Sequence, residues 1–248
     1  MRILALGGTG SVGKLVVRHA LDQGHDVVVL TRKPLRANIA LPSAATVVKG
    51  DVTTSAGLTE ALDGVDAIIS TLDGDPETTE FGGVHNVLTA LAGRRVHFVL
   101  MSSIATNNAG RLDVLDWKRR GERLVRVSGN DFTIVRPGWF DAQPAGHQAL
   151  TFAQTYKLWD IGPGAAAIGR QQIARTLVAA AGNPAANQKT FDLFASPGTA
   201  PTELDSQFTA LTADPVGALD GSYDRDDLPF DRETTAIQAA TADVTASR

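Results

Sequence analysis

Short apolar runs alternate with segments of helical periodicity through the first 136 residues. The apolar runs predict buried strands at Arg2–Leu6, Asp26–Thr31, Thr46–Lys49, Asp66–Ser70, Val96–Met101 and Phe132–Arg136. The segments between them predict helices at Ser11–Gln23, Ser55–Leu62, Phe81–Ala92 and Leu112–Ser128. This alternation implies parallel strands joined by right-handed crossovers, and therefore an α/β fold with a doubly wound parallel sheet, the Rossmann fold.

The pattern changes after Pro137. Residues 138–169 are rich in Gly, Pro, Ala and Gln, with aromatic side chains at Trp139, Phe140, Phe152, Tyr156 and Trp159. Further on, the chain predicts a helix over Gln171–Ala181, a strand over Thr190–Phe194 and a last helix over Glu203–Leu211. We interpret residues 1–248 as one domain, in which 138–169 and 195–248 form a small substrate-side lobe and a C-terminal tail. The aromatics either stack on a flat substrate or form the core of this lobe, and the second alternative is slightly favoured.

The glycine-rich segment Gly7-Gly8-Thr9-Gly10-Ser11-Val12-Gly13 follows the first predicted strand and opens the first predicted helix. In this context glycines allow a tight turn, a close approach of the backbone to a pyrophosphate, and close packing of the helix on the strand. The free N–H groups of the helix N-terminus then bind the phosphates. The segment predicts a dinucleotide site, against the alternative of a glycine turn without a ligand.

Three further segments follow the next predicted strands. Thr31-Arg32-Lys33 ends the second strand, where an NAD-binding fold usually carries an acidic residue for the ribose 2′-hydroxyl. A guanidinium there favours the 2′-phosphate of NADP(H), unless Arg32 is only a solvated loop residue. Gly50-Asp51-Val52 places Asp51 either against the adenine amine or in a cap or turn. Ser70-Thr71-Leu72 follows the fourth strand, where the chain should pass the nicotinamide ribose.

Together with these segments, three later ones carry a resemblance to a known family: Met101-Ser102-Ser103, Trp117–Glu122 and Ser128–Gly138. The sequence resembles an atypical short-chain dehydrogenase/reductase of the NmrA-like and flavin (biliverdin) reductase branch, over most of residues 1–195. The resemblance implies NADP(H) binding, with Ser102 and Ser103 near the nicotinamide or the substrate. It also implies that Pro137, Gly138 and Trp139 line the nicotinamide pocket.

One position departs from the wider superfamily. Its classical members carry a tyrosine four residues before the active-site lysine, and the phenol donates a proton. Here Val114 stands four residues before Lys118, on the same helix face, and valine cannot transfer a proton. Ser103 and Lys118 remain as candidate catalytic residues. Lys118 either binds the nicotinamide ribose or is a surface lysine paired with Glu122.

Composition limits the remaining chemistry. The chain has 248 residues and no cysteine, which excludes disulfides, thiolate nucleophiles and Cys-ligated zinc. The five histidines show no metal-ligand spacing, and we expect no metal. A net charge of −4 does not suggest a nucleic-acid surface, and no apolar run approaches the roughly 18 residues of a membrane span. The opening apolar run is too short for a signal peptide, so we expect a cytoplasmic protein; the oligomeric state stays open.

Charge is unevenly placed along the chain. Residues 213–248 hold 8 acidic and 3 basic side chains, a net charge of −5. Such a tail either balances a body that binds an anionic ligand or is only a solvated strap, and the solvated strap is the favoured interpretation.

Two functions fit these features. The first is an NADPH-dependent reductase that passes hydride to a small conjugated or carbonyl acceptor, such as a quinone, flavin or enone, which takes its proton from water. The second is an NADP(H)-binding redox sensor of the NmrA type, without turnover. The retention of Ser103 and Lys118 favours the reductase, with His147 and Tyr156 as alternative acids. A sugar-nucleotide epimerase is disfavoured because that chemistry depends on the missing tyrosine.

Overall fold

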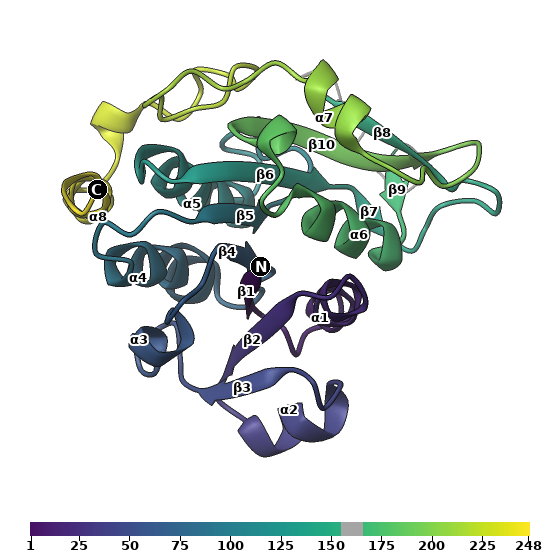
Figure 1. The fold of residues 1–248 in the computed structure, drawn as a ribbon. Coiled ribbons are helices and arrows are strands. Elements are labelled where there is room, and N and C mark those ends of the chain that lie inside the picture. The colour runs from purple at the N-terminus through teal and green to yellow at the C-terminus, as the bar shows by residue number, and fades with distance from the viewer. Residues whose placement is uncertain (155–165) are drawn as a thin grey trace.

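The computed structural model describes residues 1–154 and 166–248 and shows a mostly parallel eight-stranded sheet (Figure 1). The strand order is β3-β2-β1-β4-β5-β6-β10-β8, and the chain reverses its direction of winding between β1 and β4. The strands are β1 (Arg2–Leu6), β2 (Asp26–Thr31), β3 (Thr46–Lys49), β4 (Ala67–Ser70), β5 (His97–Met101), β6 (Asp131–Pro137), β8 (Ala149–Ala153) and β10 (Lys189–Ser196). This confirms the predicted doubly wound α/β fold, which places ligands at the carboxyl ends of the strands near the reversal.

Helices cover both faces of the sheet, and each face has its own apolar core. One face carries α1 (Gly13–Asp22), α2 (Pro34–Ala40), α6 (Arg170–Ala180) and α7 (Asp205–Ala210). The other carries α3 (Leu58–Ala61), α4 (Gly82–Ala90), α5 (Asp113–Val127) and α8 (Thr235–Ala246). The described residues also contain two 3₁₀ turns, Pro184–Ala186 and Phe230–Arg232. None of the helices there is long and apolar enough to cross a membrane.

Several elements differ from the sequence prediction. The helix expected over Ser11–Gln23 begins at Gly13, because the glycine loop continues to that point. The helix expected over Phe81–Ala92 is preceded by a π-helical turn, η1 (Pro76–Phe81), which leads directly into α4. Strand β8, which pairs antiparallel with β10 at the sheet edge, was not predicted, and neither were α2 and α8. Their apolar positions are too few to show a period before tertiary packing is known.

The aromatics of residues 138–169 separate into two groups. Phe152 on β8 stacks on Phe191 with ring centroids 4.4 Å apart and meets Phe208 of α7 edge-on at 5.3 Å, so it belongs to the core. Trp139 and Phe140 instead remain exposed on the short strand β7 (Trp139–Phe140), which pairs with β9 (Ala167–Ile168). Tyr156 and Trp159 lie outside the described residues. The assignment of 138–169 to a substrate-side lobe stays a prediction.

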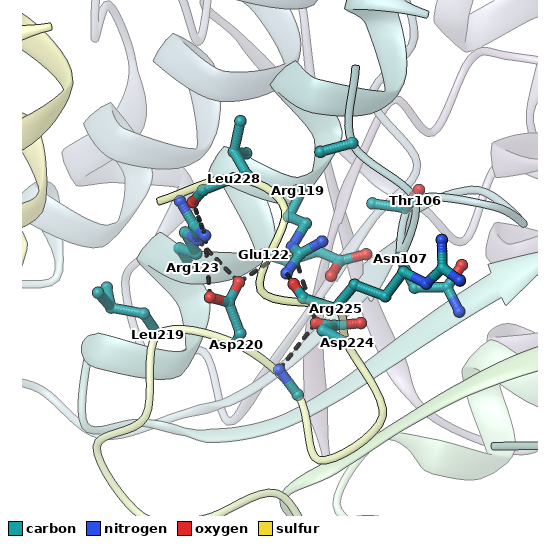
Figure 2. A network of polar contacts seen from close by, with 12 residues as sticks. Thr106, Asn107, Arg119, Glu122, Arg123, Leu219, Asp220, Asp224, Arg225 and Leu228 are labelled. Carbon is teal, nitrogen blue, oxygen red and sulfur yellow. Dashed lines mark hydrogen bonds and ion pairs between the residues drawn. The ribbon is translucent and has the colours of Figure 1, made fainter. Parts of the chain in front are cut away.

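The acidic tail is not a solvated strap, and that interpretation was wrong. Residues 213–233, here called the C-terminal strap, cross α5 and carry carboxylates that pair with its arginines (Figure 2). Asp220 receives hydrogen bonds from Arg119 at 3.0 Å and from Arg123 at 2.8 Å. The side chains of Asp214 and Asp224 are buried, and Asp224 Oδ1 accepts a 2.7 Å bond from Arg136. The tail charge therefore balances a buried arginine cluster.

Candidate functional site

The glycine loop joins β1 to α1 at the point where the sheet reverses its winding. Gly7 has a φ of 72°, and a Cβ there would lie 2.4 Å from the carbonyl oxygen of Thr71 at the end of β4. A Cβ at Gly13 would lie 2.1 Å from the carbonyl oxygen of Gly7. Gly10 N donates to Gly7 O at 2.8 Å and closes the turn. The loop is thus compact enough to hold the N-terminus of α1 over a phosphate group, as the sequence predicts.

A cavity of about 250 Å³, here called the nucleotide cleft, runs from this loop along the carboxyl ends of β2, β3 and β4. It brings together nine of the predicted cofactor residues from four separate segments of the chain: Gly7, Thr9, Gly10, Thr31, Arg32, Asp51, Val52, Thr71 and Leu72. Its size and its polar walls around an open mouth fit the adenosine half of a dinucleotide.

Arg32 and Asp51 both line this cleft. Thr53 N and Thr53 Oγ1 both donate to Asp51 Oδ1 at 2.9 Å. These bonds, and secondarily the positive charge of Arg32, hold the pKa of the Asp51 carboxyl below its usual range. The turn interpretation of Asp51 is therefore observed, and its contact with adenine stays a prediction. The exposed Arg32 guanidinium has no hydrogen bond or salt bridge within the described parts of the chain, which leaves all its donors available for an anion.

A second and smaller cavity, here called the inner pocket, adjoins the cleft through Leu72, which lines both. Ser70, Glu80, Ser102 and Lys118 also line it. Ser70 is buried, and its hydroxyl has no hydrogen-bond partner among the described residues. A dinucleotide that enters along the glycine loop would thus continue towards three polar groups and an ammonium.

Lys118 is not paired with Glu122, and that alternative was wrong. Its Nζ donates to Glu80 Oε2 at 2.5 Å, and Glu80 lies in the π-helical turn η1. Glu122 is instead fully buried and accepts from Arg136 and Arg126. Because Lys118 is directed towards Glu80 of η1 and Glu122 towards Arg136 of β6, the two side chains do not pair. Sequence analysis did not identify Glu80, since no motif marks it.

Ser103 lies on the loop that follows β5, outside the lining of both cavities. The loop is held by short contacts: Thr106 Oγ1 donates to Ser103 O at 2.6 Å, and Ala109 N donates to Asp227 of the strap at 3.1 Å. Val114 is half-buried at the start of α5. The structure therefore places Ser102, rather than Ser103, in the lining of the same pocket as Lys118, and the role of Ser103 stays a prediction.

Pro137, Gly138 and Trp139 are held by backbone pairing. Pro137 is buried in β6, and Trp139 N donates to Ala166 O at 2.7 Å. A Cβ at Gly138 would lie 2.0 Å from that same oxygen, so the close approach that requires glycine here is to Ala166. Their contact with a nicotinamide stays a prediction.

Arg170, at the start of α6, was missed by sequence analysis although it reaches the glycine loop. Its Nε donates to Ser11 Oγ at 3.2 Å, its guanidinium lies 5.0 Å from the Phe140 ring centroid, and it pairs with Asp141. The sequence carried no signal for it, because 159 residues separate Arg170 from Ser11.

His97 has a structural role. His97 is buried, and burial lowers its pKa to about 4, although the nearby Asp131 acts in the opposite direction. Its Nδ1 accepts from Gly182 N at 3.0 Å, so Nε2 carries the proton and donates to Thr133 at 2.9 Å. Within residues 1–154 and 166–248, no group of three or more His, Cys, Asp or Glu side chains is arranged to hold a metal ion. Of the alternative acids, His147 is half-buried and Tyr156 lies outside the described residues.

Comparison with known proteins points to the same cofactor class. The sequence profile of a family described as NAD(P)H-binding matches residues 7–184. Over 213 residues the chain is 28% identical to the photosystem II assembly factor Ycf39 of Synechocystis sp. (82% of this chain, 65% of the relative). It is 27% identical to quinone oxidoreductase 2 of Escherichia coli over 141 residues (56% of this chain, 49% of the relative). The chain thus spans less than two thirds of the length of either relative.

Among solved structures, the fold is similar to the NADPH-dependent quinone oxidoreductase of Escherichia coli in complex with NADPH. The TM-score is 0.63 at 19% identity, and the match covers 84% of this chain and 74% of that one. This similarity supports the fold.

Proposed function

Because the chain belongs to the NAD(P)H-binding family, we propose that it is an NADPH-dependent oxidoreductase that transfers hydride to a small acceptor of the quinone, flavin or enone type. The observation that carries the proposal is that the nucleotide cleft and the inner pocket are neighbours, with Leu72 in the lining of both. The glycine loop and Arg32 line the cleft, and Lys118 lines the inner pocket. The names of relatives such as quinone oxidoreductase 2 support the acceptor class.

Each end of the bound cofactor would meet a positive charge. The glycine loop and the N-terminus of α1 would hold the pyrophosphate, and Arg32 would bind the 2′-phosphate with charge-assisted hydrogen bonds. Lys118 would hold a hydroxyl of the nicotinamide ribose and so fix the direction of the ring. NADPH supplies the hydride when bound.

The chain itself contributes mainly orientation. Val114 stands where a classical relative carries the proton-donating tyrosine, so no side chain at that position protonates the product. A quinone, flavin or enone fits this arrangement, because its reduced form takes a proton from water. Cofactor binding that excludes bulk water from the inner pocket would strengthen the contact between Lys118 and the ribose.

The experiment has two parts. Purified protein and NADPH are mixed with a panel of quinones, flavins and enones, and cofactor oxidation is followed by absorbance. The dissociation constants of NADPH and NADH are then measured by calorimetry in Arg32→Ala, with Arg36→Ala on the exposed side of α2 as the matched control. We expect Arg32→Ala to weaken NADPH by about 10- to 100-fold and to leave NADH nearly unchanged, since a hydrogen bond to a charged group contributes about 1.5–3 kcal/mol. An equal loss for both cofactors would contradict the assignment of Arg32.

The second candidate is a non-catalytic NADP(H)-binding redox sensor of the NmrA type. Val114 favours it, because the chain lacks the usual proton donor, and the similarity to a protein named as an assembly factor is compatible with it. The acceptor panel separates the two functions. NADPH binding without oxidation by any acceptor would replace the reductase proposal with the sensor. The absence of cysteine supports a cytoplasmic location in either case.

A further inference from the structure

The Glu80–Lys118 salt bridge is largely buried at the inner pocket. The exposed fractions of the two side chains are 8% for Glu80 and 15% for Lys118. In the described parts of the chain, Lys118 has no other hydrogen-bond or ion-pair partner than Glu80 Oε2. One carboxylate therefore sets the direction of the ammonium, and two of its three N–H donors remain for other groups.

Glu80 is placed by unusual backbone geometry. It lies in the π-helical turn η1, where Glu80 N donates to Asp75 O at 3.2 Å, five residues earlier. The turn begins at a well-defined cap, because Asp75 Oδ1 accepts from Thr78 N at 2.8 Å. Short π-helical segments are rare in proteins, and those that occur often lie at functional sites.

A chain neighbour of each partner also takes part in the contact between the two segments. Phe81, which follows Glu80, packs on Trp117, which precedes Lys118, with ring centroids 5.4 Å apart. Arg120 lies 4.6 Å from the Trp117 ring centroid and pairs with Glu233 of the strap, so it does not compete for Glu80. The Glu80 carboxylate therefore pairs with Lys118 and not with Arg120.

We propose that Glu80 is a positioning residue, which fixes the Lys118 ammonium so that its remaining donors face the nicotinamide ribose. This inference rests on the proposed function, because it assigns the ribose contact to Lys118. The physical reason is the burial of Lys118 in a pocket that Leu100 and Met101 also line. An ammonium in such a place needs a counter-charge, and without one it turns towards water.

The first test observes Lys118 directly, without any turnover. The chain has six lysines, so protein labelled with ¹⁵N-lysine gives few ammonium signals, and Lys118→Arg identifies the one from Lys118. We expect the parent to show a Lys118 ammonium protected from solvent exchange and Glu80→Gln to lose that protection. Glu77→Gln, at an exposed position of the same turn, should leave the signal unchanged. A Lys118 signal that is the same in Glu80→Gln as in the parent would overturn the inference.

The second test is a double-mutant cycle on the dissociation constant of NADPH. We expect Lys118→Met and Glu80→Gln each to weaken NADPH, by about tenfold for Lys118→Met. The double variant should bind no more weakly than Lys118→Met, because Glu80 acts only through the ammonium. Additive losses, or an unchanged affinity in Lys118→Met, would refute this.

Glu80→Asp is a second variant for the case in which Glu80→Gln does not fold. It keeps the charge on a side chain one methylene shorter, so it should recover part of the NADPH affinity lost in Glu80→Gln. If Glu80→Gln does not fold, Glu80→Asp takes over the test: an unshifted Lys118 signal with parent affinity would then overturn the inference. The acceptor panel tests the reductase proposal independently of these two tests. If the protein gives the expected results in both tests but reduces no acceptor, Glu80 is still the positioning residue, in a sensor instead of a reductase.

Discussion

Replacing Asp224 by asparagine tests whether the C-terminal strap is an integral part of the domain. Asp224 accepts hydrogen bonds from Arg136 Nη1 at 2.7 Å and Nη2 at 3.1 Å, and from Gly221 N at 2.8 Å. Its side chain is 1% exposed, and Arg126 Nη2 lies 3.6 Å from its Oδ2. Burial by itself raises the pKa of this carboxyl, but the guanidinium groups of Arg136 and Arg126 hold it well below its usual range.

The size of the effect follows from this burial. Asparagine keeps one acceptor oxygen but turns an N–H₂ group towards guanidinium donors, which leaves positive charge buried without its full counter-charge. Removing one partner of such a buried pair lowers the free energy of unfolding by about 3–5 kcal/mol. For a chain of this length, each kcal/mol lowers Tm by about 2–4 °C, so we expect a loss of roughly 6–20 °C.

The assay is urea unfolding at pH 7 followed by circular dichroism, with a thermal scan of the same samples. Asp226→Asn is the matched control, because Asp226 is exposed on the same strap and has no hydrogen bond or ion pair with any described residue. That variant should stay within about 0.5 kcal/mol of the parent. If Asp224→Asn unfolds at the same urea concentration as Asp226→Asn, the strap does not contribute to the stability of the domain and the argument from burial is wrong.

Three further outcomes are expected. Gly10→Val should abolish NADPH binding in a folded protein, because its Cβ would lie 3.1 Å from Gly7 O and the rest of the side chain would fill the pyrophosphate space; unchanged affinity by calorimetry would contradict this. As pH falls from 6.5 to about 4, the unfolded chain protonates His97 before the folded chain does. The free energy of unfolding should therefore fall by on the order of 3 kcal/mol across this window, and His97→Asn should remove that dependence in urea titrations. Ser103→Ala should slow turnover about 100-fold if its hydroxyl polarises the acceptor, whereas Val114→Ala should keep most activity; equal rates would exclude Ser103 from the site.

The part of the site that is local in sequence was predictable. The glycine loop lies within seven residues between a strand and a helix, and its geometry depends on which residues tolerate close contact, as Gly7 and Gly13 show. Arg32 was predictable for the same reason, since the end of a strand places it in the cleft whatever the rest of the chain does. Parallel topology followed from the alternation of strands and helices, because a crossover helix leaves few arrangements of the sheet.

Partners distant in sequence were not predictable. For Lys118 the sequence offered Glu122, four residues away, as one alternative partner, whereas in the structure Lys118 pairs with Glu80, 38 residues away. The cause is the rotation of α5, which directs Glu122 to Arg136 and Lys118 to η1. The pattern of residues along the chain predicts which side chains share a face of the helix, but it does not predict which element packs against that face.

The C-terminal strap shows the same limit on a larger scale. The arginines of α5 have the spacing of a charged, solvated helix face, and the acidic tail has the composition of a solvated segment. Each is unremarkable alone, and only the tertiary structure shows that they bury one another, as Arg126 and Asp214 do at 3.1 Å across 88 residues. The sequence by itself determined the parallel strands of the sheet, the glycine loop and the charge that each segment carries. Tertiary packing decided which charges meet, because ion pairing depends on the distance between atoms and on burial, and neither is encoded in local periodicity.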